Sequence, residues 1–265
     1  MHSAALQTNY ISDSGNFAAD EQASAFKRTS QSWYFLSAVD VLVPTEVTGA
    51  VVVLGDSITD GASSKPDSNG RWTDVLARRL VAEDAWPRMA VLNAGIGGNR
   101  VLTSSPCWGV NALARLQRDV LEQSGVRAVI LFEGTNDIGQ PDTPSTPNIA
   151  LCLSHTQIIA DDLIAGYRQI IAQTHARGLK IFGATILPYQ GFRGWTPRGE
   201  AKRNAVNQWI RTANEFDGVI DFDAALRDPT NPARLSPQYD SGDHLHPGPQ
   251  GHEAMGNLVD LHLFR

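Results

Sequence analysis

Ala50-Val51-Val52-Val53-Leu54, followed at once by Gly55-Asp56-Ser57-Ile58-Thr59-Asp60-Gly61, is the stretch that decides the fold. The apolar run has the length of a buried strand, and it ends where the small and polar residues begin. Small residues around Ser57 let the backbone turn tightly, so the hydroxyl can project from the C-terminal edge of a sheet, where open α/β sheets bind ligands. We therefore expect Ser57 to lie on a strand-to-loop turn, in the position of a nucleophile.

Strand-like and helix-like patterns alternate along the rest of the chain. Further apolar runs of strand length are found at residues 90–92, 128–132, 180–184 and 219–222. Helix-like segments separate or follow them at residues 72–83, 111–123, 157–177, 197–215 and 249–262. This alternation is typical of a doubly wound parallel sheet. The predicted fold is α/β: a three-layer αβα sandwich, flavodoxin-like, with about five parallel strands.

The segment Asp243-His244-Leu245-His246-Pro247 supplies a carboxylate and an imidazole three residues apart. A serine needs these two partners to become nucleophilic at neutral pH. We expect His246 to be the general base for Ser57 and Asp243 to orient its ring. His244 is the alternative base, and otherwise a loop histidine.

Four blocks in this order resemble an SGNH hydrolase of the GDSL esterase/lipase superfamily. They are Gly55-Asp56-Ser57-Ile58-Thr59-Asp60-Gly61, Asn93-Ala94-Gly95-Ile96-Gly97-Gly98-Asn99-Arg100, Gly134-Thr135-Asn136-Asp137 and the pair Asp243 and His246. The resemblance runs from about Val51 to the C-terminus. It implies a carboxylic ester hydrolase that works through an acyl-enzyme, with Ser57, Asp243 and His246 as catalytic triad and with neither metal nor cofactor.

The resemblance also implies three donors for the oxyanion of the tetrahedral intermediate: the backbone N–H groups of Ser57 and Gly98 and the side-chain amide of Asn136. Such donors usually contribute roughly 3–4 kcal/mol each. We expect neighbouring block residues to have supporting roles. Asp56, Asp60 and Asp137 would cap their local turns, and Asn99 and Arg100 would tie the second block to its surroundings.

Loops after the strands should determine specificity, with candidates at residues 104–110, 138–154 and 188–195. Trp108, Tyr189, Phe192 and Trp195 are candidate substrate-binding residues, because aromatic side chains can form the wall of an acyl pocket or stack on a sugar. They could equally belong to packed loops or a subunit contact. The resemblance suggests short acyl groups, from acetyl to butyryl, and sugar acetates.

Two other functions are compatible with parts of the sequence. In a metal-dependent phosphoesterase, acidic and imidazole side chains would cluster as ligands, here Asp221, Asp223, Asp243, His244 and His246. A non-catalytic carbohydrate-binding or partner-binding module could retain the same blocks without reacting.

Composition limits the partners. The 265 residues carry a net charge of −6 and a sequence pI of about 5.6, which argues against nucleic acid or an anionic membrane as partner. The expected partner is a small-molecule ester. The start of the chain shows no secretory signal, so we expect a cytoplasmic protein as the sequence stands, and a secreted or periplasmic one if the start is incomplete. Cys107 and Cys152 could form a disulfide or remain free thiols.

The first 45 residues lie outside the resemblance, and residues 46–265 form the expected catalytic domain. Residues 1–27 are rich in Ser, Ala, Asn and Asp and are expected to be irregular. The aromatic, β-prone stretch at residues 32–43 predicts a strand. It could be the remnant of a small β-module or an arm on a neighbouring subunit, which leaves a homo-oligomer possible.

Overall fold

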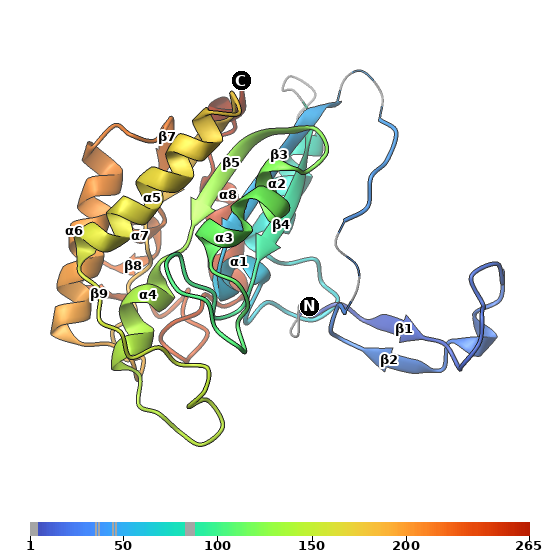
Figure 1. Ribbon diagram of the computed structural model, residues 1–265, viewed down its shortest axis with the longest axis horizontal. Coiled ribbons are helices and arrows are strands. Elements are labelled where there is room, and N and C mark those ends of the chain that lie inside the picture. Colours follow the sequence, from blue (N-terminus) through green and yellow to red (C-terminus); the bar gives the residue numbers. More distant parts are fainter. Residues whose placement is uncertain (1–4, 35, 37, 44, 46, 83–87) are drawn as a thin grey trace.

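A five-stranded parallel sheet forms the centre of the protein in a computed structural model, which describes residues 5–34, 36, 38–43, 45, 47–82 and 88–265 (Figure 1). The strand order is β4-β3-β5-β6-β7. Their bounds are β3 (Val47–Gly55), β4 (Arg88–Gly95), β5 (Val126–Phe132), β6 (Lys180–Ala184) and β7 (Gly218–Ile220). The chain therefore enters in β3 and winds outward on both sides of it, as in flavodoxin-like sheets.

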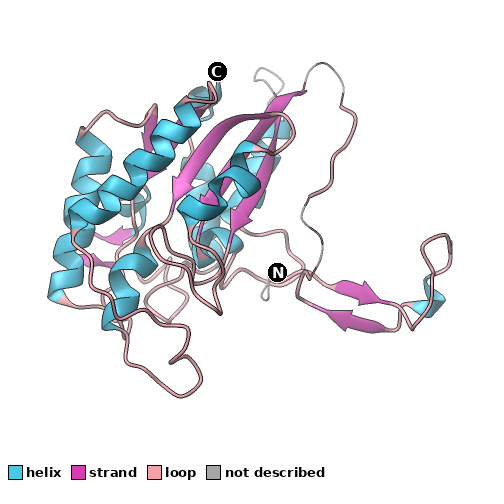
Figure 2. Cartoon of the chain, viewed as in Figure 1, coloured by secondary structure: helices cyan, strands magenta, loops and turns pink. Residues whose placement is uncertain are grey.

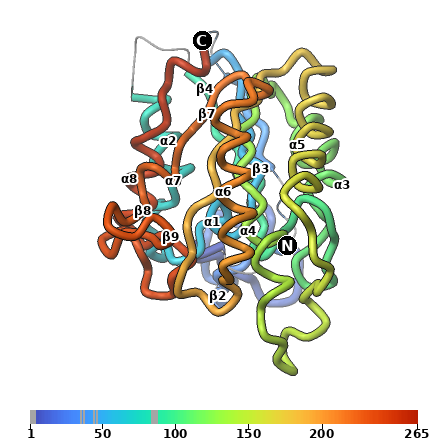
Figure 3. Tube along the Cα trace, turned by 90° about the vertical axis from the view of Figure 1, so that its left-hand side faces the viewer, coloured from blue at the N-terminus to red at the C-terminus, as the bar shows by residue number. Residues whose placement is uncertain are grey.

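Helices cover both faces of the sheet, so the predicted three-layer αβα sandwich is confirmed (Figure 3). One face packs on α2 (Trp72–Ala82), α7 (Phe222–Leu226) and α8 (Pro249–Leu258). The other face packs on α3 (Ala112–Leu116), α5 (Ala160–His175) and α6 (Pro197–Thr212).

Strand β3 supplies side chains to both hydrophobic cores. Val51 and Val53 point into the core beneath α2 and α8, whereas Val52 and Leu54 point into the core beneath α3 and α5. All four are inaccessible to solvent, and burial of each such side chain stabilises the fold by about 1.5–3 kcal/mol. Because successive side chains of a strand alternate between faces, an uninterrupted apolar run is what a central strand requires.

Several elements differ in extent from the sequence prediction. The predicted strand at 219–222 ends at Ile220, because the Asp221 side chain accepts the Ala224 N–H at 3.1 Å and caps α7. The predicted helix at 111–123 is divided into α3 and a π-helical turn, η2 (Gln117–Leu121). The helix expected at 249–262 ends at Leu258 and is followed by a 3₁₀ turn, η4 (Leu261–Phe264). Glu83, the expected end of α2, lies outside the described residues.

Short elements follow the ends of the strands (Figure 2). Helix α1 (Ser57–Asp60) follows β3, and α4 (Thr135–Gly139) with the 3₁₀ turn η3 (Gln140–Asp142) follows β5. The hairpin β8 (Arg227–Asp228) and β9 (Asn231–Leu235) precedes the segment that contains His246.

The described residues among the first 45 form an arm that projects from the body (Figure 1). It contains an antiparallel hairpin of β1 (Asn9–Ile11) and β2 (Arg28–Ser30), with a 3₁₀ turn, η1 (Ala23–Ala25), between them. The strand expected at residues 32–43 is not found among the described residues of that stretch, which are loop apart from a bridge at Trp33. Phe35 and Ser37 lie outside the description. Val39 and Leu42 are exposed, so these two β-prone side chains pack against no strand that the structure describes.

Arg71 anchors this arm to the body. Its buried guanidinium donates to the Ala5 and Asp60 carbonyl oxygens, the latter at 3.0 Å, and lies 5.9 Å from the centre of the Trp33 ring. Asp67 adds a second connection by accepting the Thr8 N–H and hydroxyl. The base of the arm is thus fixed next to helix α1.

Candidate active site

Three loops begin at the same level of the sheet. Gly55 at the end of β3 is in register with Gly95 at the end of β4 and with Phe132 at the end of β5. The sheet's winding direction changes at β3, and the crevice beyond such a switch point is where this type of sheet binds ligands. The first three sequence blocks therefore converge at one site.

Ser57 is the first residue of α1. Asp56 caps this helix by accepting the Ile58 N–H at 3.0 Å, and Gly61 ends it with φ of 110°. Burial raises the pKa of Asp56 to about 6, although its bond from Ile58 opposes the shift. Gly95 lies so close that a Cβ there would be 2.3 Å from the Asp60 nitrogen, so only glycine lets β4 approach the helix.

Ser57, His246 and Asp243 form a continuous hydrogen-bonded chain. Ser57 Oγ lies 2.8 Å from His246 Nε2, and His246 Nδ1 lies 2.6 Å from Asp243 Oδ2. The other oxygen of Asp243 accepts the backbone N–H groups of Leu245 and His246. Desolvation opposes the charge on Asp243, but the bonds from His246 and these N–H groups outweigh it, so the pKa of this carboxyl lies well below its usual value.

His244, the alternative base, is held elsewhere. Its Nδ1 lies 2.7 Å from Asp240 Oδ2, and its ring packs over Gly191, where a Cβ would be 2.8 Å from Cγ. Its φ is +65°, in the left-handed region. The structure therefore pairs His246, not His244, with Ser57.

The second block is held in place by α4 and η3, through side chains one helical turn apart. Asn136 Nδ2 donates to the Asn99 carbonyl at 3.0 Å, and Gln140 Nε2 donates to the Gly98 carbonyl at 2.8 Å. Both carbonyls of the turn are thereby fixed. An amide carries two N–H bonds, so the contact with Asn99 leaves Asn136 a second donor. Gly98 has φ of 75°, a conformation that favours glycine.

Asp137 does more than the local capping expected from sequence. Its carboxylate accepts the N–H groups of Val101 and Leu102, at 2.8 and 3.0 Å, across to the second block. Burial raises the pKa of Asp137 to about 6, against the effect of these two bonds. Asn99 ties the same loop as expected, because its amide donates to the Trp108 and Val110 carbonyls.

Arg115 lies beneath the site and joins the ends of two strands. Its buried guanidinium donates to Gly55 O at 3.0 Å, Ala94 O at 2.6 Å and Asn99 Oδ1 at 3.0 Å. It also pairs with the buried Glu133 at 3.5 Å. The sequence analysis missed this role. The available signal was an arginine on the buried face of the predicted helix 111–123, one residue before Leu116.

Ser57 and His246 open into a cavity of about 190 Å³. Three of the four predicted substrate-binding residues, Trp108, Tyr189 and Phe192, line it. Trp195 does not, because it packs against the core beneath α5 and α6. The other lining residues include Gly139, Gln140, Thr143, Leu153 and Arg193, which lie in the predicted specificity loops 138–154 and 188–195, and Thr135 of the third block. Leu245 also lines the cavity and was not expected there.

Cys107 and Cys152 form a disulfide, with Cα atoms 5.3 Å apart. This settles the alternative that the sequence left open. The bond connects the loop after the second block with the long loop between η3 and α5.

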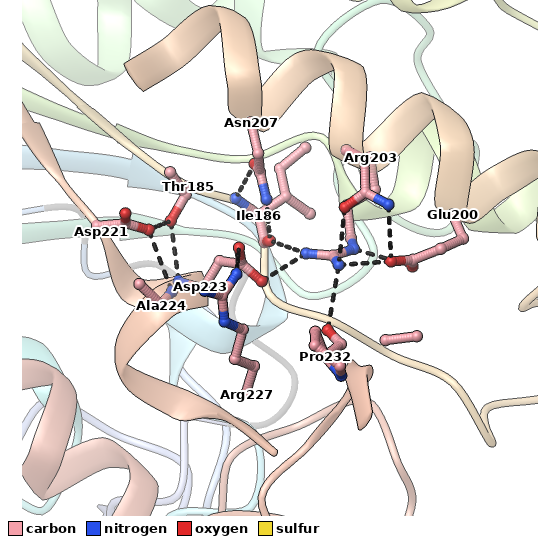
Figure 4. Close-up of polar contacts among 12 residues, drawn as sticks. Thr185, Ile186, Glu200, Arg203, Asn207, Asp221, Asp223, Ala224, Arg227 and Pro232 are labelled. Atoms are coloured by element: carbon pink, nitrogen blue, oxygen red, sulfur yellow. Dashed lines mark hydrogen bonds and ion pairs between the residues drawn. The ribbon is translucent and has the colours of Figure 1, made fainter. Parts of the chain in front are cut away.

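The metal-ligand cluster considered for a phosphoesterase is not assembled. Asp223 is buried and paired with Arg203 at 2.7 Å and Arg227 at 3.4 Å, in a network that also includes Glu200 and Asp221 (Figure 4). His246 is paired with Ser57 and Asp243 instead. In the part of the chain that the structure describes, no three Asp, Glu, His or Cys side chains are grouped to hold an ion.

Fold and site together define a three-layer α/β protein with a serine just after the first strand of its parallel sheet. A family model for the GDSL-like lipase/acylhydrolase family matches residues 53–254, and the chain belongs to this family. It is accordingly an enzyme of the esterase and acylhydrolase class. None of the curated proteins matches the sequence. Among the described residues, no helix has the length and apolarity needed to cross a bilayer.

Solved structures share the fold at low sequence identity. The acetylxylan esterase Axe2 from Geobacillus stearothermophilus is 20% identical, with a TM-score of 0.58 over 80% of this chain and 92% of its own. The acetyl xylan esterase AlAXEase is 19% identical, with a TM-score of 0.57 over 79% and 96%. The lipase/acylhydrolase from Enterococcus faecalis is 23% identical, with a TM-score of 0.55 over 79% and 92%.

Proposed function

We propose that the protein hydrolyses carboxylic esters of short acyl chains, from acetyl to butyryl, through an acyl-enzyme on Ser57. The observation that carries this proposal is the chain of hydrogen bonds from Ser57 through His246 to Asp243 at the mouth of a 190 Å³ cavity. A serine hydroxyl in contact with an oriented imidazole is the arrangement required for nucleophilic attack on an acyl carbon.

In the first half-reaction, Ser57 Oγ attacks the ester carbonyl and His246 Nε2 takes the hydroxyl proton. The oxyanion would be met by the N–H groups of Ser57 and Gly98 and by the Asn136 amide. His246 then returns the proton to the departing alcohol, and the acyl group stays on Ser57. In the second half-reaction, water attacks with His246 again as base, which releases the carboxylic acid and restores the serine.

Sugar acetates are the substrates we favour. The Geobacillus and AlAXEase neighbours are acetyl xylan esterases by name, and their fold likeness makes the acetyl group of a carbohydrate the first to test. A small cavity with aromatic walls suits an acetyl group on one side of the ester and a ring on the other.

The test compares wild type, Ser57→Ala and His246→Ala on p-nitrophenyl acetate and on acetylated xylo-oligosaccharides, with and without EDTA. His244→Ala is the matched control, because its imidazole is bound to Asp240. We expect both active-site variants to lose at least about 10³-fold in kcat, and the control to change less than about twofold. Activity that survives Ser57→Ala, or that EDTA abolishes, would overturn the proposal. An optimum at octanoyl esters would overturn the short-chain preference alone.

We also infer that the protein works in an oxidising compartment rather than in the cytoplasm. The support is the Cys107–Cys152 bond, since disulfides persist in secreted and periplasmic proteins and are rare in a reducing cytosol. Protein isolated from its natural source under conditions that block thiol exchange should show no free thiol after denaturation. Two titratable thiols would contradict this.

A further inference from the structure

The disulfide joins two walls of the cavity. Cys107 directly precedes Trp108, and Cys152 directly precedes Leu153; both of these neighbours line the cavity beside Ser57. The two lining residues come from loops 45 residues apart in the sequence. The bond therefore fixes the spacing of two side chains that a bound substrate would touch.

Trp108 has supports of its own. Asn99 Nδ2 donates to the Trp108 carbonyl at 2.8 Å, and the Ser105 N–H donates to the Gly109 carbonyl at 2.9 Å. The indole ring lies against Gly98, where a Cβ would be only 2.5 Å from it. This wall would keep its place next to the oxyanion donors if the disulfide were opened.

The position of Leu153 depends on the disulfide far more than that of Trp108 does. Leu153 lies on the long loop between η3 and α5, which extends away from the central sheet (Figure 1). Residues 144–151 of this loop are largely exposed. The backbone hydrogen bonds of Cys152 and Leu153 are local, both to the Ile149 carbonyl. Besides the disulfide, Ser105 Oγ connects the neighbouring loop to Cys152 by donating to the Cys152 carbonyl at 2.9 Å. A loop with few buried contacts opens at low free-energy cost.

We propose that the Cys107–Cys152 disulfide determines acyl-chain selectivity by holding Leu153 as the wall that limits the length of the acyl pocket. This inference rests on the proposed ester hydrolysis. Breaking the bond frees Leu153 while Trp108, Gly98 and the Ser57–His246 pair stay in place. Acetyl esters should then react nearly as before, and longer acyl chains should enter a pocket that had excluded them.

The size of the expected change in selectivity follows because a single leucine side chain forms the wall. One methylene more or less in an apolar pocket changes kcat/KM by about 10–200-fold in enzymes that discriminate by fit. We therefore expect the ratio of kcat/KM for p-nitrophenyl octanoate to that for the acetate to rise about tenfold when the disulfide is lost. The acetate value itself should fall by less than about threefold, because the oxyanion side of the site does not depend on Cys152.

The experiment uses the double variant Cys107→Ser/Cys152→Ser, the single variant Leu153→Ala, and their combination, on acetate, butyrate and octanoate esters. Leu151→Ala is the matched control, because Leu151 lies in the same loop but is 85% exposed and outside the cavity lining. Wild type treated with dithiothreitol is a second route to the open state. The dithiol gives two electrons and two protons to the disulfide, yielding two cysteine thiols and the cyclic disulfide of the reagent.

The proposal predicts that the double variant, Leu153→Ala and reduced wild type all raise the octanoate-to-acetate ratio of kcat/KM. The combined variant should raise this ratio little beyond either of its parents. Leu151→Ala should leave the ratio unchanged, and so should dithiothreitol added to the double variant. An unchanged octanoate-to-acetate ratio in Leu153→Ala, which keeps the disulfide, would overturn it even if the double variant failed to fold. A parallel loss on every ester in the double variant and the reduced enzyme would assign the bond to stability alone. Failure of the proposed function would appear separately, as activity retained in Ser57→Ala.

Discussion

Replacing Arg115 by methionine should lower the free energy of unfolding by about 3–5 kcal/mol. The substitution removes the donor to Gly55 O, Ala94 O and Asn99 Oδ1, and it leaves Glu133 buried without its cationic partner. The side chains of Arg115 and Glu133 are 1% and 0% exposed, so water cannot replace the lost contacts without rearrangement. For a chain of this size the melting temperature should fall by roughly 6–20 °C.

The penalty should depend on pH because of Glu133. Burial raises the pKa of Glu133 well above its ordinary value; Arg115 opposes this shift, and Asp56 and Asp137 add to it. A carboxyl whose pKa is raised on folding stabilises the folded state fully below its unfolded pKa, and this contribution is lost as pH rises through the folded pKa. Without Arg115 the pKa of Glu133 in the folded state rises further. The loss in free energy of unfolding should therefore be greatest at high pH and smallest in acid.

Urea unfolding of wild type and Arg115→Met, at about pH 8 and about pH 5, measures this difference. Comparing the two proteins at each pH removes the effect of Asp137, whose pKa of about 6 falls in the same window. Asp56 also has a pKa of about 6, and Arg115 lowers it, so loss of Arg115 raises this pKa and adds to the pH dependence in the same direction as Glu133. Adding Glu133→Gln to Arg115→Met should recover part of the loss at the higher pH, since the unpaired carboxylate of Glu133 is then absent. An equal penalty at both pH values together with no recovery in the double variant would refute the reasoning.

Two further predictions concern the site. Gln140→Leu should lower kcat for acetyl esters by about 5–10-fold with little change in KM, because the Gly98 carbonyl loses its donor and the N–H of Gly98, a proposed oxyanion donor, loses its fixed orientation. Steady-state kinetics measure this effect, with a melting curve as control, and a loss confined to KM would count against this role. Asp243→Asn should lower kcat by about 10³–10⁴-fold without loss of fold. The pH profile of wild-type activity should show no acid limb from Asp243 above about pH 4, because the pKa of this carboxyl is depressed and it remains charged. An acid limb in that range that is traced to Asp243 would contradict this.

The fold was predictable because its signals are local. The uninterrupted apolar run 50–54 indicates a strand buried on both faces, and alternation with helical segments implies a parallel sheet. The strand at residues 32–43 was predicted wrongly for the described part of that stretch, because aromatic and β-branched side chains favour strands only where another strand is available to pair. Whether the arm is the remnant of a β-module stays a prediction.

The site was predictable where residues act through short motifs. Ser57, His246 and Asp243 follow from blocks with fixed internal spacing, and the structure brings their side chains together. Arg115 could not be found this way, because its role arises from contacts between segments distant in sequence. Leu153 lies in a loop that the sequence marked for specificity, but which residues of that loop line the cavity depends on contacts that the sequence does not carry. Trp195 shows the converse: an aromatic residue in a loop near the site can face the core, and sequence carries no information on which way it points.

The arginine that anchors the arm has a consequence for any shortened form of this protein. Arg71 binds the carbonyl of Ala5 with the same guanidinium that binds the carbonyl of Asp60, the last residue of the helix that begins with Ser57. A chain cut after Ala5 would leave the buried Arg71 guanidinium without the Ala5 carbonyl as acceptor. The other carbonyl that this guanidinium binds belongs to Asp60, three residues after Ser57. Turnover, as well as stability, should therefore fall when the segment that contains Ala5 is removed.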